Sequence, residues 1–132
     1  MARLNPYIAF QTEAREAMEF YRSVLGGQLD IMPFGDEDAG DSALVMHAQL
    51  ETPDGFTLMA SDTPGIVPAP KPAGFWISID GDDEAKLEGY WNALAEGGTI
   101  DEPMDTPPWG GRFGMLTDRF GIRWMVSVNA AQ

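Results

Sequence analysis

Cysteine is absent from this chain of 132 residues, and histidine occurs once, at position 47. Without thiols there is no disulfide framework, no thiolate metal site and no cysteine nucleophile. Basic residues are also few, since 8 Lys and Arg stand against 21 Asp and Glu, which gives a formal net charge of −13. A surface this acidic repels phosphate backbones and anionic lipid, so we expect no nucleic-acid partner and no membrane partner.

Long apolar runs are missing as well. No stretch approaches the ~20 residues that a membrane span needs, and no apolar signal core follows the N-terminus, so we expect a cytoplasmic protein rather than an exported one. The 44% of hydrophobic and 11% of aromatic residues are typical of a globular chain. A chain of this length normally folds as one domain.

An internal repeat organises the chain. Residues 5–10 align with residues 74–79 after a shift of 69 positions, and residues 55–61 align with residues 121–127 after a shift of 66. Between these matches, Gly26-Gly27 of the first half corresponds to Gly97-Gly98 of the second, after a two-residue insertion. Three matches in the same order indicate a duplicated unit of roughly sixty residues.

Each unit is predicted to be a strand, a helix and three further strands. The first helix is expected at 13–25 with Thr12 as its N-cap, because apolar residues recur there at helical spacing. The second helix begins at the acidic run 82–84, which suits a helix N-terminus. The buried stripe of this second helix is predicted to be Leu87, Tyr90, Trp91 and Leu94. The glycine pairs that follow the two helices are Gly26-Gly27 and Gly97-Gly98. Strands are expected at 4–10, 28–34, 43–51 and 56–61, then at 74–80, 99–104, 112–117 and 122–128.

A proline-rich stretch separates the two modules. Residues 62–72 carry four prolines, which cannot donate to a strand ladder, so we expect a stiff connector there. Module one then covers residues 1–61 and module two covers residues 73–132, together forming a single domain over residues 1–132.

Six segments, in order over almost the entire chain, carry a family resemblance: Pro6-Tyr7-Ile8-Ala9-Phe10, Ala17-x-x-Phe20-Tyr21, Val45-Met46-His47-Ala48-Gln49-Leu50, Leu58-Met59-Ala60-Ser61-Asp62, Trp109-Gly110-x-x-Phe113-Gly114 and Asp118-Arg119-Phe120-Gly121-Ile122-Arg123-Trp124-Met125. They resemble the PhnB-like proteins, a branch of the vicinal oxygen chelate superfamily, which includes glyoxalase I, extradiol dioxygenases and bleomycin-resistance proteins. The resemblance implies an α+β fold in which two βαβββ modules form an open, curled mixed sheet with a central cleft, usually within a homodimer. The methyltransferase and phosphonate labels of some PhnB-like proteins do not carry over, because neither a Gly-x-Gly-x-x-Gly motif nor a phosphate loop with its lysine occurs.

Metal-dependent members of the superfamily place His and Glu ligands on the first and fourth strands of each module. The resemblance puts these positions at Pro6, Met59, Phe75 and Met125, and the internal repeat pairs them in the same way. None of them supplies the imidazole nitrogen or carboxylate oxygen that divalent zinc, nickel or manganese requires. We therefore expect no bound metal and no cofactor, with the two methionines filling a core or a pocket.

Alternation along the strands predicts which side chains face the cleft. With the four ligand positions facing inward, Ile8, Phe10 and Ile77 face inward too, whereas Tyr7 and Trp76 pack beneath the helices. The result is a mostly apolar pocket with a few converging polar groups, the usual form of a small-molecule site.

His47 is the central polar residue of this predicted pocket. A hairpin folded about Pro53 sets it opposite Met59, where it is a candidate for lining the pocket or for proton transfer. Arg123 is predicted to share that pocket and is a candidate for holding a carboxylate or phosphonate, or for a salt bridge at the rim. Trp109 is a candidate for stacking on a ligand or for a dimer interface. The predicted ligand-binding residues are His47, Gln49, Thr57, Met59, Ser61, Phe75, Trp109, Arg123 and Met125.

Three functions stay open at this point. The first is a cytoplasmic homodimer that binds a small organic molecule without a metal, for instance by sequestering a flat cationic compound as resistance proteins do. The second is a metal-dependent lyase, isomerase or dioxygenase with ligands not identified here, which the metal content of the purified protein would reveal. The third is a structural or regulatory dimer whose cleft is filled by its own side chains, namely Met59, Phe75, Met125 and Trp109.

Overall fold

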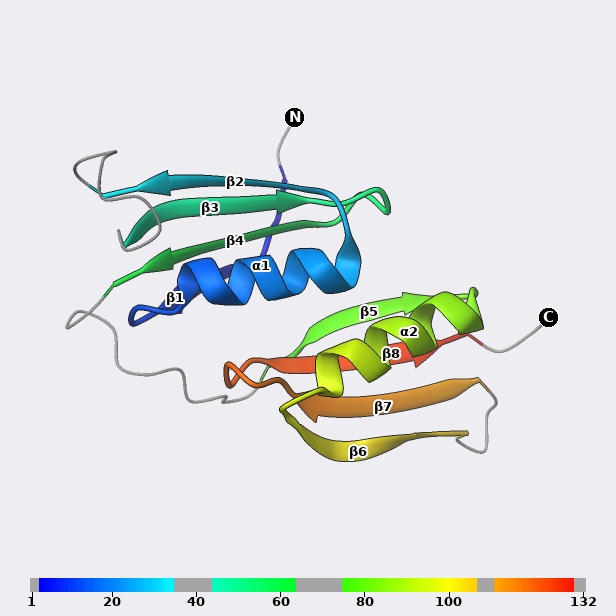
Figure 1. Cartoon of the computed structure of the whole chain (residues 1–132). Helices are drawn as coiled ribbons and strands as arrows, with labels where there is room; N and C mark the ends of the chain where they lie inside the picture. Colours follow the sequence, from blue (N-terminus) through cyan, green and yellow to red (C-terminus); the bar gives the residue numbers. More distant parts are fainter. Residues whose placement is uncertain (1–2, 35–43, 64–74, 107–110, 130–132) are drawn as a thin grey trace. The chain divides into compact units, whose positions relative to one another are not determined.

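The computed structural model divides into two compact units, Met1–Pro70 and Lys71–Gln132 (Figure 1). Both units have the element order β-α-β-β-β that the internal repeat predicts. The structure describes residues 3–34, 44–63, 75–106 and 111–129. Most of the predicted connector, residues 62–72, lies outside the described residues, and the central cleft between the modules stays a prediction.

The first unit is a four-stranded mixed sheet with one helix against it. Its strand order is β1-β4-β3-β2, with β1 parallel to β4 and the other neighbours antiparallel. Figure 1 shows α1 lying along this sheet. The elements are β1 (Tyr7–Phe10), α1 (Ala14–Leu25), β2 (Gln28–Pro33), β3 (Val45–Glu51) and β4 (Thr57–Asp62).

The core of this unit lies between α1 and one face of the sheet. Met18 and Tyr21 of the helix are fully buried, as are Val45 and Leu50 of β3. Each large apolar side chain that is buried in this way stabilises the fold by about 1.5–3 kcal/mol. The helix covers only one face, so the alternate side chains of the same strands are left on the opposite face.

The start of α1 differs from the prediction. Thr12 is exposed, and the N-cap residue is Glu13, whose side chain makes no capping hydrogen bond. Asp62, at the end of β4, caps the helix instead: its carboxylate accepts from the backbone N–H of Ala14 at 2.9 Å and from that of Val45 at 2.8 Å. One carboxylate, only 2% exposed, thus joins the helix start to two strands.

The second unit repeats this arrangement. Its sheet has the order β5-β8-β7-β6, again with one parallel pair, β5 with β8. Asp83, within the predicted acidic run, caps α2 by accepting from the backbone N–H of Lys86 at 3.1 Å. The buried residues of α2 are the four of the predicted stripe. The elements are β5 (Ile77–Gly81), α2 (Glu84–Ala95), β6 (Thr99–Asp105), β7 (Arg112–Thr117) and β8 (Arg123–Val128).

The glycine pairs have the same structural role in both units. A Cβ atom on Gly27 would collide with the carbonyl oxygen of Glu51, and one on Gly98 would collide with that of Thr117. A shift of 66 positions relates Glu51 to Thr117. The chain therefore needs glycine at equivalent points where it leaves the helix and crosses the neighbouring strand.

Within the described ranges, neither helix is long and apolar enough to cross a membrane.

Candidate functional site

The face of the first sheet opposite α1, here called the open face, carries most of the residues predicted for ligand binding. Its strands contribute alternate side chains, as their pairing and burial indicate. These side chains are Tyr7 and Ala9 from β1, Thr57, Met59 and Ser61 from β4, His47, Gln49 and Glu51 from β3, and Gln28, Asp30 and Met32 from β2.

Strand β1 reverses the predicted alternation. Ile8 and Phe10, expected in the cleft, are buried, whereas Tyr7, expected beneath the helix, is 53% exposed. The reason is the register of the parallel pair, in which Tyr7 lies beside Met59. The mapping from the sequence placed Pro6 at that position, one residue too early.

The β3–β4 register also differs from the prediction, by two residues. Gln49, not His47, is opposite Met59. In the same register His47 lies across from Ser61. A shift of two residues preserves the face on which a side chain lies, so His47 stays on the open face as predicted, and it is half-buried there.

The turn between β3 and β4 explains this shift. The backbone N–H of Thr52 donates to the Phe56 carbonyl at 3.0 Å, and the Thr52 Oγ1 atom accepts from the Phe56 N–H at 3.1 Å. Gly55 has a φ of 87°, which adds a left-handed residue to the loop. The second unit builds the same turn with Asp118, which accepts from the Ile122 N–H at 3.0 Å.

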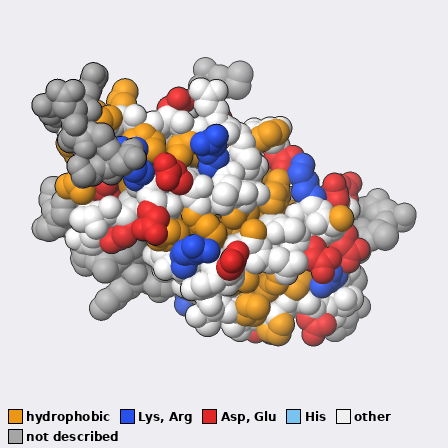
Figure 2. Space-filling model, in the orientation of Figure 1, with side chains coloured by type: hydrophobic (Ala, Val, Ile, Leu, Met, Phe, Trp, Pro, Cys, Tyr) orange, Lys and Arg blue, Asp and Glu red, His pale blue; other side chains and the backbone are white. Residues whose placement is uncertain are grey.

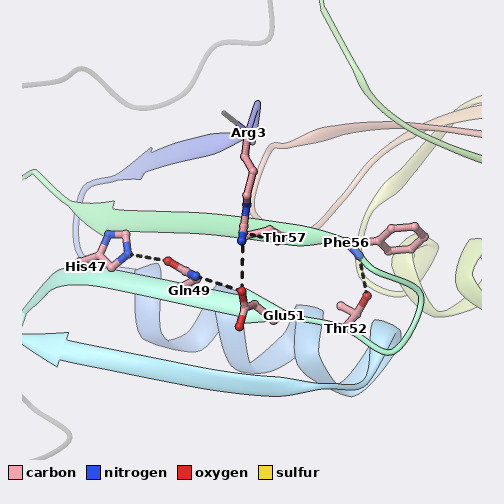
Figure 3. A network of polar contacts seen from close by, with 7 residues as sticks. All are labelled: Arg3, His47, Gln49, Glu51, Thr52, Phe56 and Thr57. Carbon is pink, nitrogen blue, oxygen red and sulfur yellow. Dashed lines mark hydrogen bonds and ion pairs between the residues drawn. The ribbon is translucent and has the colours of Figure 1, made fainter. Parts of the chain in front are cut away.

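Hydrogen bonds link four side chains in a row across the open face. The Tyr7 hydroxyl lies 3.2 Å from His47 Nδ1, and His47 Nε2 lies 3.3 Å from Gln49 Oε1. Gln49 Nε2 donates to Glu51 Oε1 at 3.4 Å. Figure 3 shows the part of this row that runs from His47 to Glu51 along β3. We call the row Tyr7–His47–Gln49–Glu51 the polar chain.

Arg3 holds the far end of the polar chain. Its Nη2 atom lies 3.6 Å from Glu51 Oε1 and donates to Thr57 Oγ1 at 2.9 Å (Figure 3). Both ion-pair partners are about half exposed, so this pair contributes about 0–1 kcal/mol to stability and mainly orients Glu51. A shallow depression of about 550 Å³ lies at this end, lined by Arg3, Leu4, Asn5, Glu51, Thr52, Gly55, Phe56 and Thr57.

The second sheet also has an open face, opposite α2. Ile77 pairs with the buried Trp124, and Ser78 pairs with Met125. Trp76 therefore lies on the open side and not beneath the helix as predicted, and the Arg123 guanidinium stacks 4.8 Å from its ring centroid. This contact is a cation–π pair that orients Arg123.

The predicted site residues thus fall into two groups, one in each unit. His47, Gln49, Thr57, Met59 and Ser61 belong to the first sheet, whereas Arg123 and Met125 belong to the second and Phe75, which is 68% exposed, precedes it. The shared pocket for His47 and Arg123 stays a prediction. Trp109 lies outside the described residues.

Tyr7, Glu51 and Arg3 join His47 on the open face, and none of the three was among the predicted ligand-binding residues. A clue for Tyr7 was available in the repeat, which aligns it with Trp76.

Among the described residues, no group of three or more His, Asp or Glu side chains is placed to hold a metal ion. In the view of Figure 2, acidic side chains occur over both units, as the net charge leads one to expect.

Paired βαβββ modules, each with a helix on one face of its sheet and mixed polar and aromatic side chains on the other, define an α+β protein of the glyoxalase type. A family model of the Glyoxalase/Bleomycin resistance protein/Dioxygenase superfamily matches residues 3–126, and the chain belongs to this superfamily. The superfamily assigned by resemblance is thereby confirmed.

Individual relatives resemble this chain over nearly its whole length. The crystal structure of protein PA1353 from Pseudomonas aeruginosa is 40% identical and has a TM-score of 0.85, with 99% of this chain and 100% of that chain covered. Protein YjdN of Escherichia coli (strain K12) is 28% identical over 95% of this chain and 94% of its own length. A protein from Bacillus cereus described as a putative 3-demethylubiquinone-9 3-methyltransferase, PhnB protein, is 24% identical with a TM-score of 0.78, and covers 97% of this chain and 100% of its own; this likeness is one of fold.

Proposed function

We propose that this chain binds a small organic molecule on the open faces of its sheets, without the metal centre of the metal-dependent members of its superfamily. The observation that carries the proposal is the polar chain, which joins side chains of β1 and β3 and is supported by Arg3. Met59 lies beside Tyr7 and Gln49 on the same face and adds an apolar surface.

The physical argument is preorganisation. Long polar side chains on a solvated strand face lose rotamer freedom when they are fixed in one row, at a cost of about 0.5–1.5 kcal/mol each. When the row is already ordered in the free protein, ligand binding does not include this entropic cost. Converging polar groups beside aromatic and apolar surface are the usual form of a small-molecule site.

The acidic charge favours one class of ligand over others. With a net charge of −13, the protein attracts cations and repels anions. A flat cationic compound would gain from this field and from stacking on exposed aromatic rings such as Tyr7. Sequestration of such a compound is therefore the simplest activity consistent with the site.

A homodimer is part of the same proposal. Each unit has one sheet face without a helix. The resemblance to the superfamily implies that modules pair within one chain and across two chains. A second copy would cover apolar groups such as Phe75, which is 68% exposed. We expect this dimer to act in the cytoplasm.

A thermal-shift screen tests the binding proposal, with cationic, neutral and anionic aromatic compounds compared in parallel. A ligand at 100 times its Kd adds about 2.7 kcal/mol to the free energy of unfolding. We expect stabilisation by cationic compounds that is lost in Gln49→Ala and kept in the matched control Glu19→Gln, on the exposed side of α1. Hits that are insensitive to Gln49→Ala, or no hits at all, would contradict the proposal.

The same screen separates this proposal from a metal-dependent enzyme. It is run once after EDTA treatment and once with nickel, zinc or manganese. A ligand that stabilises the protein only when metal is present would favour the metal-dependent alternative. Equal stabilisation in both series supports binding without a metal.

A further inference from the structure

The two ends of the polar chain differ in chemistry, and this difference gives its hydrogen bonds a direction. Glu51 is an exposed carboxylate that lies 3.6 Å from Arg3 Nη2, and it only accepts hydrogen bonds. The Gln49 amide NH₂ must therefore face Glu51, at 3.4 Å, and the Gln49 oxygen must face His47 (Figure 3). The carboxylate thus fixes the orientation of the next side chain.

His47 extends this direction to Tyr7. Its Nε2 atom lies 3.3 Å from the Gln49 oxygen, which can only accept, so Nε2 carries the ring proton. Neutral imidazole has a single N–H group, and Nδ1 is therefore an acceptor. The Tyr7 hydroxyl, at 3.2 Å from Nδ1, donates to it. Every donation in the polar chain thus runs from Tyr7 toward Glu51.

The Tyr7 oxygen is the open end of this series of donations. Its proton is engaged with His47, so only its lone pairs are left for a molecule that arrives from solvent. Hydrogen bonds in a row polarise one another, which strengthens this oxygen as an acceptor. Tyr7 is 53% exposed, whereas Tyr21 and Tyr90 are buried. A ligand group that meets the Tyr7 oxygen must therefore be a hydrogen-bond donor.

The charge of the open face favours a donor that is positively charged. Among the described residues of this face, Asp30 and Glu51 contribute carboxylates, and the Arg3 guanidinium is paired with Glu51. The whole protein, with a net charge of −13, attracts cations. We infer that the open face recognises an aromatic cation through an N–H group, such as a protonated ring nitrogen or amine, that donates to the Tyr7 oxygen. The inference rests on the proposed function for the place of the ligand, and it adds the group by which the ligand is recognised.

A requirement for an N–H donor divides aromatic cations into two classes of equal charge. A protonated nitrogen donates to Tyr7, whereas a quaternary nitrogen carries a methyl group in place of the N–H group. Both classes gain from the acidic field and from apolar contact, so neither charge nor shape explains a difference between them. A hydrogen bond with a charged donor is stronger than a neutral one, and we expect a difference in Kd of about tenfold.

Protonated 4-(dimethylamino)quinoline and its ring-N-methylated quaternary analogue test this requirement. Both are flat, singly charged cations, and one N–H group is replaced by N–CH₃. Titrations are followed by the ring signals of ¹⁵N-histidine-labelled protein, which need no assignment because the chain has a single histidine. The pH is set above the titration of His47 and below that of the quinolinium. We expect the protonated cation to bind about tenfold more tightly, and a ratio within about twofold, or tighter binding of the quaternary cation, would overturn the inference.

Tyr7→Phe separates the hydrogen bond from contact with the aromatic ring. It keeps the ring and removes the accepting oxygen, so the protonated cation should lose its advantage and bind within about twofold of the quaternary one. Tyr90→Phe is the matched control, because Tyr90 is buried in α2 of the second unit, and it should keep the native ratio. Circular dichroism confirms that each variant is folded. A native ratio in Tyr7→Phe would contradict recognition through the Tyr7 oxygen.

The direction of the polar chain is tested without any ligand. In the native protein, long-range ¹H–¹⁵N spectra should show His47 with Nε2 protonated and Nδ1 bare. Glu51→Lys places a donor where the acceptor was, which turns the Gln49 amide round, so the ring proton of His47 should shift toward Nδ1. Glu19→Lys, on the exposed side of α1, makes the same change of charge and should leave the tautomer unchanged. A protonated Nδ1 in the native chain, or a native tautomer in Glu51→Lys, would refute the inference.

The proposed function and this inference fail in different ways. If neither cation binds at millimolar concentration, the proposed function is refuted and the inference falls with it. If both cations bind with equal affinity, the proposed function stands and the inference alone is refuted.

Discussion

Asp62 joins the start of α1 to β3, and replacing it with alanine should destabilise the first unit strongly. The carboxylate accepts from the backbone N–H groups of Ala14 and Val45, and it is 2% exposed. Asp62→Ala leaves two buried donors without an acceptor. Each such group costs about 1–3 kcal/mol, and loss of the carboxylate's own desolvation cost offsets part of this. We expect the free energy of unfolding to fall by about 3 kcal/mol.

Two further variants sharpen this prediction. Asp62→Asn keeps one oxygen acceptor but turns an NH₂ group toward the second donor, so we expect the free energy of unfolding to fall by about 1–2 kcal/mol. Thr12→Ala removes the cap predicted from the sequence. Because the exposed Thr12 does not cap the helix, this substitution should change the free energy of unfolding by no more than about 0.5 kcal/mol.

Urea unfolding followed by far-UV circular dichroism measures these differences. All four tryptophans lie in the second unit, so their fluorescence reports on that unit rather than on the Asp62 cap. A fall of less than about 1 kcal/mol for Asp62→Ala, or an equal fall for Thr12→Ala, would refute the assignment of Asp62 as the cap.

Three further predictions concern packing, metal and assembly. Gly114→Ala should cost about 1–3 kcal/mol in urea unfolding, because its Cβ would lie 2.6 Å from the buried Trp91 ring. Gly89→Ala on the exposed side of α2 meets nothing within 4 Å and should stabilise by about 0.4–1 kcal/mol; equal effects at the two sites would contradict this. EDTA should leave the melting temperature unchanged and nickel, zinc or manganese should not raise it, and a metal-dependent rise lost on mutating Met59 or Met125 would disprove the metal-free mapping. Sedimentation at micromolar concentration should show a dimer rather than a 14.4 kDa monomer.

The sequence alone determined the elements and their order. Helical spacing of apolar residues, the acidic start of α2 and the glycine pairs are local signals, and local sequence therefore predicts them. The internal repeat predicted that the two units are equivalent. Gly27 and Gly98 show one physical reason for this equivalence, because a side chain at either position would collide with a strand carbonyl. Membership of the superfamily followed from the same segments.

Only the tertiary structure decided which way short strands face and what meets across them. Residues Tyr7–Phe10 are apolar throughout, so the sequence offers no polar alternation, and pairing with β4 chooses the buried face. Gly55 sets the β3–β4 register through its left-handed conformation. Asp62 caps a helix that begins 48 positions earlier, and Tyr7 reaches His47 across 40 positions. Contacts between distant positions depend on strand pairing, which no local pattern encodes.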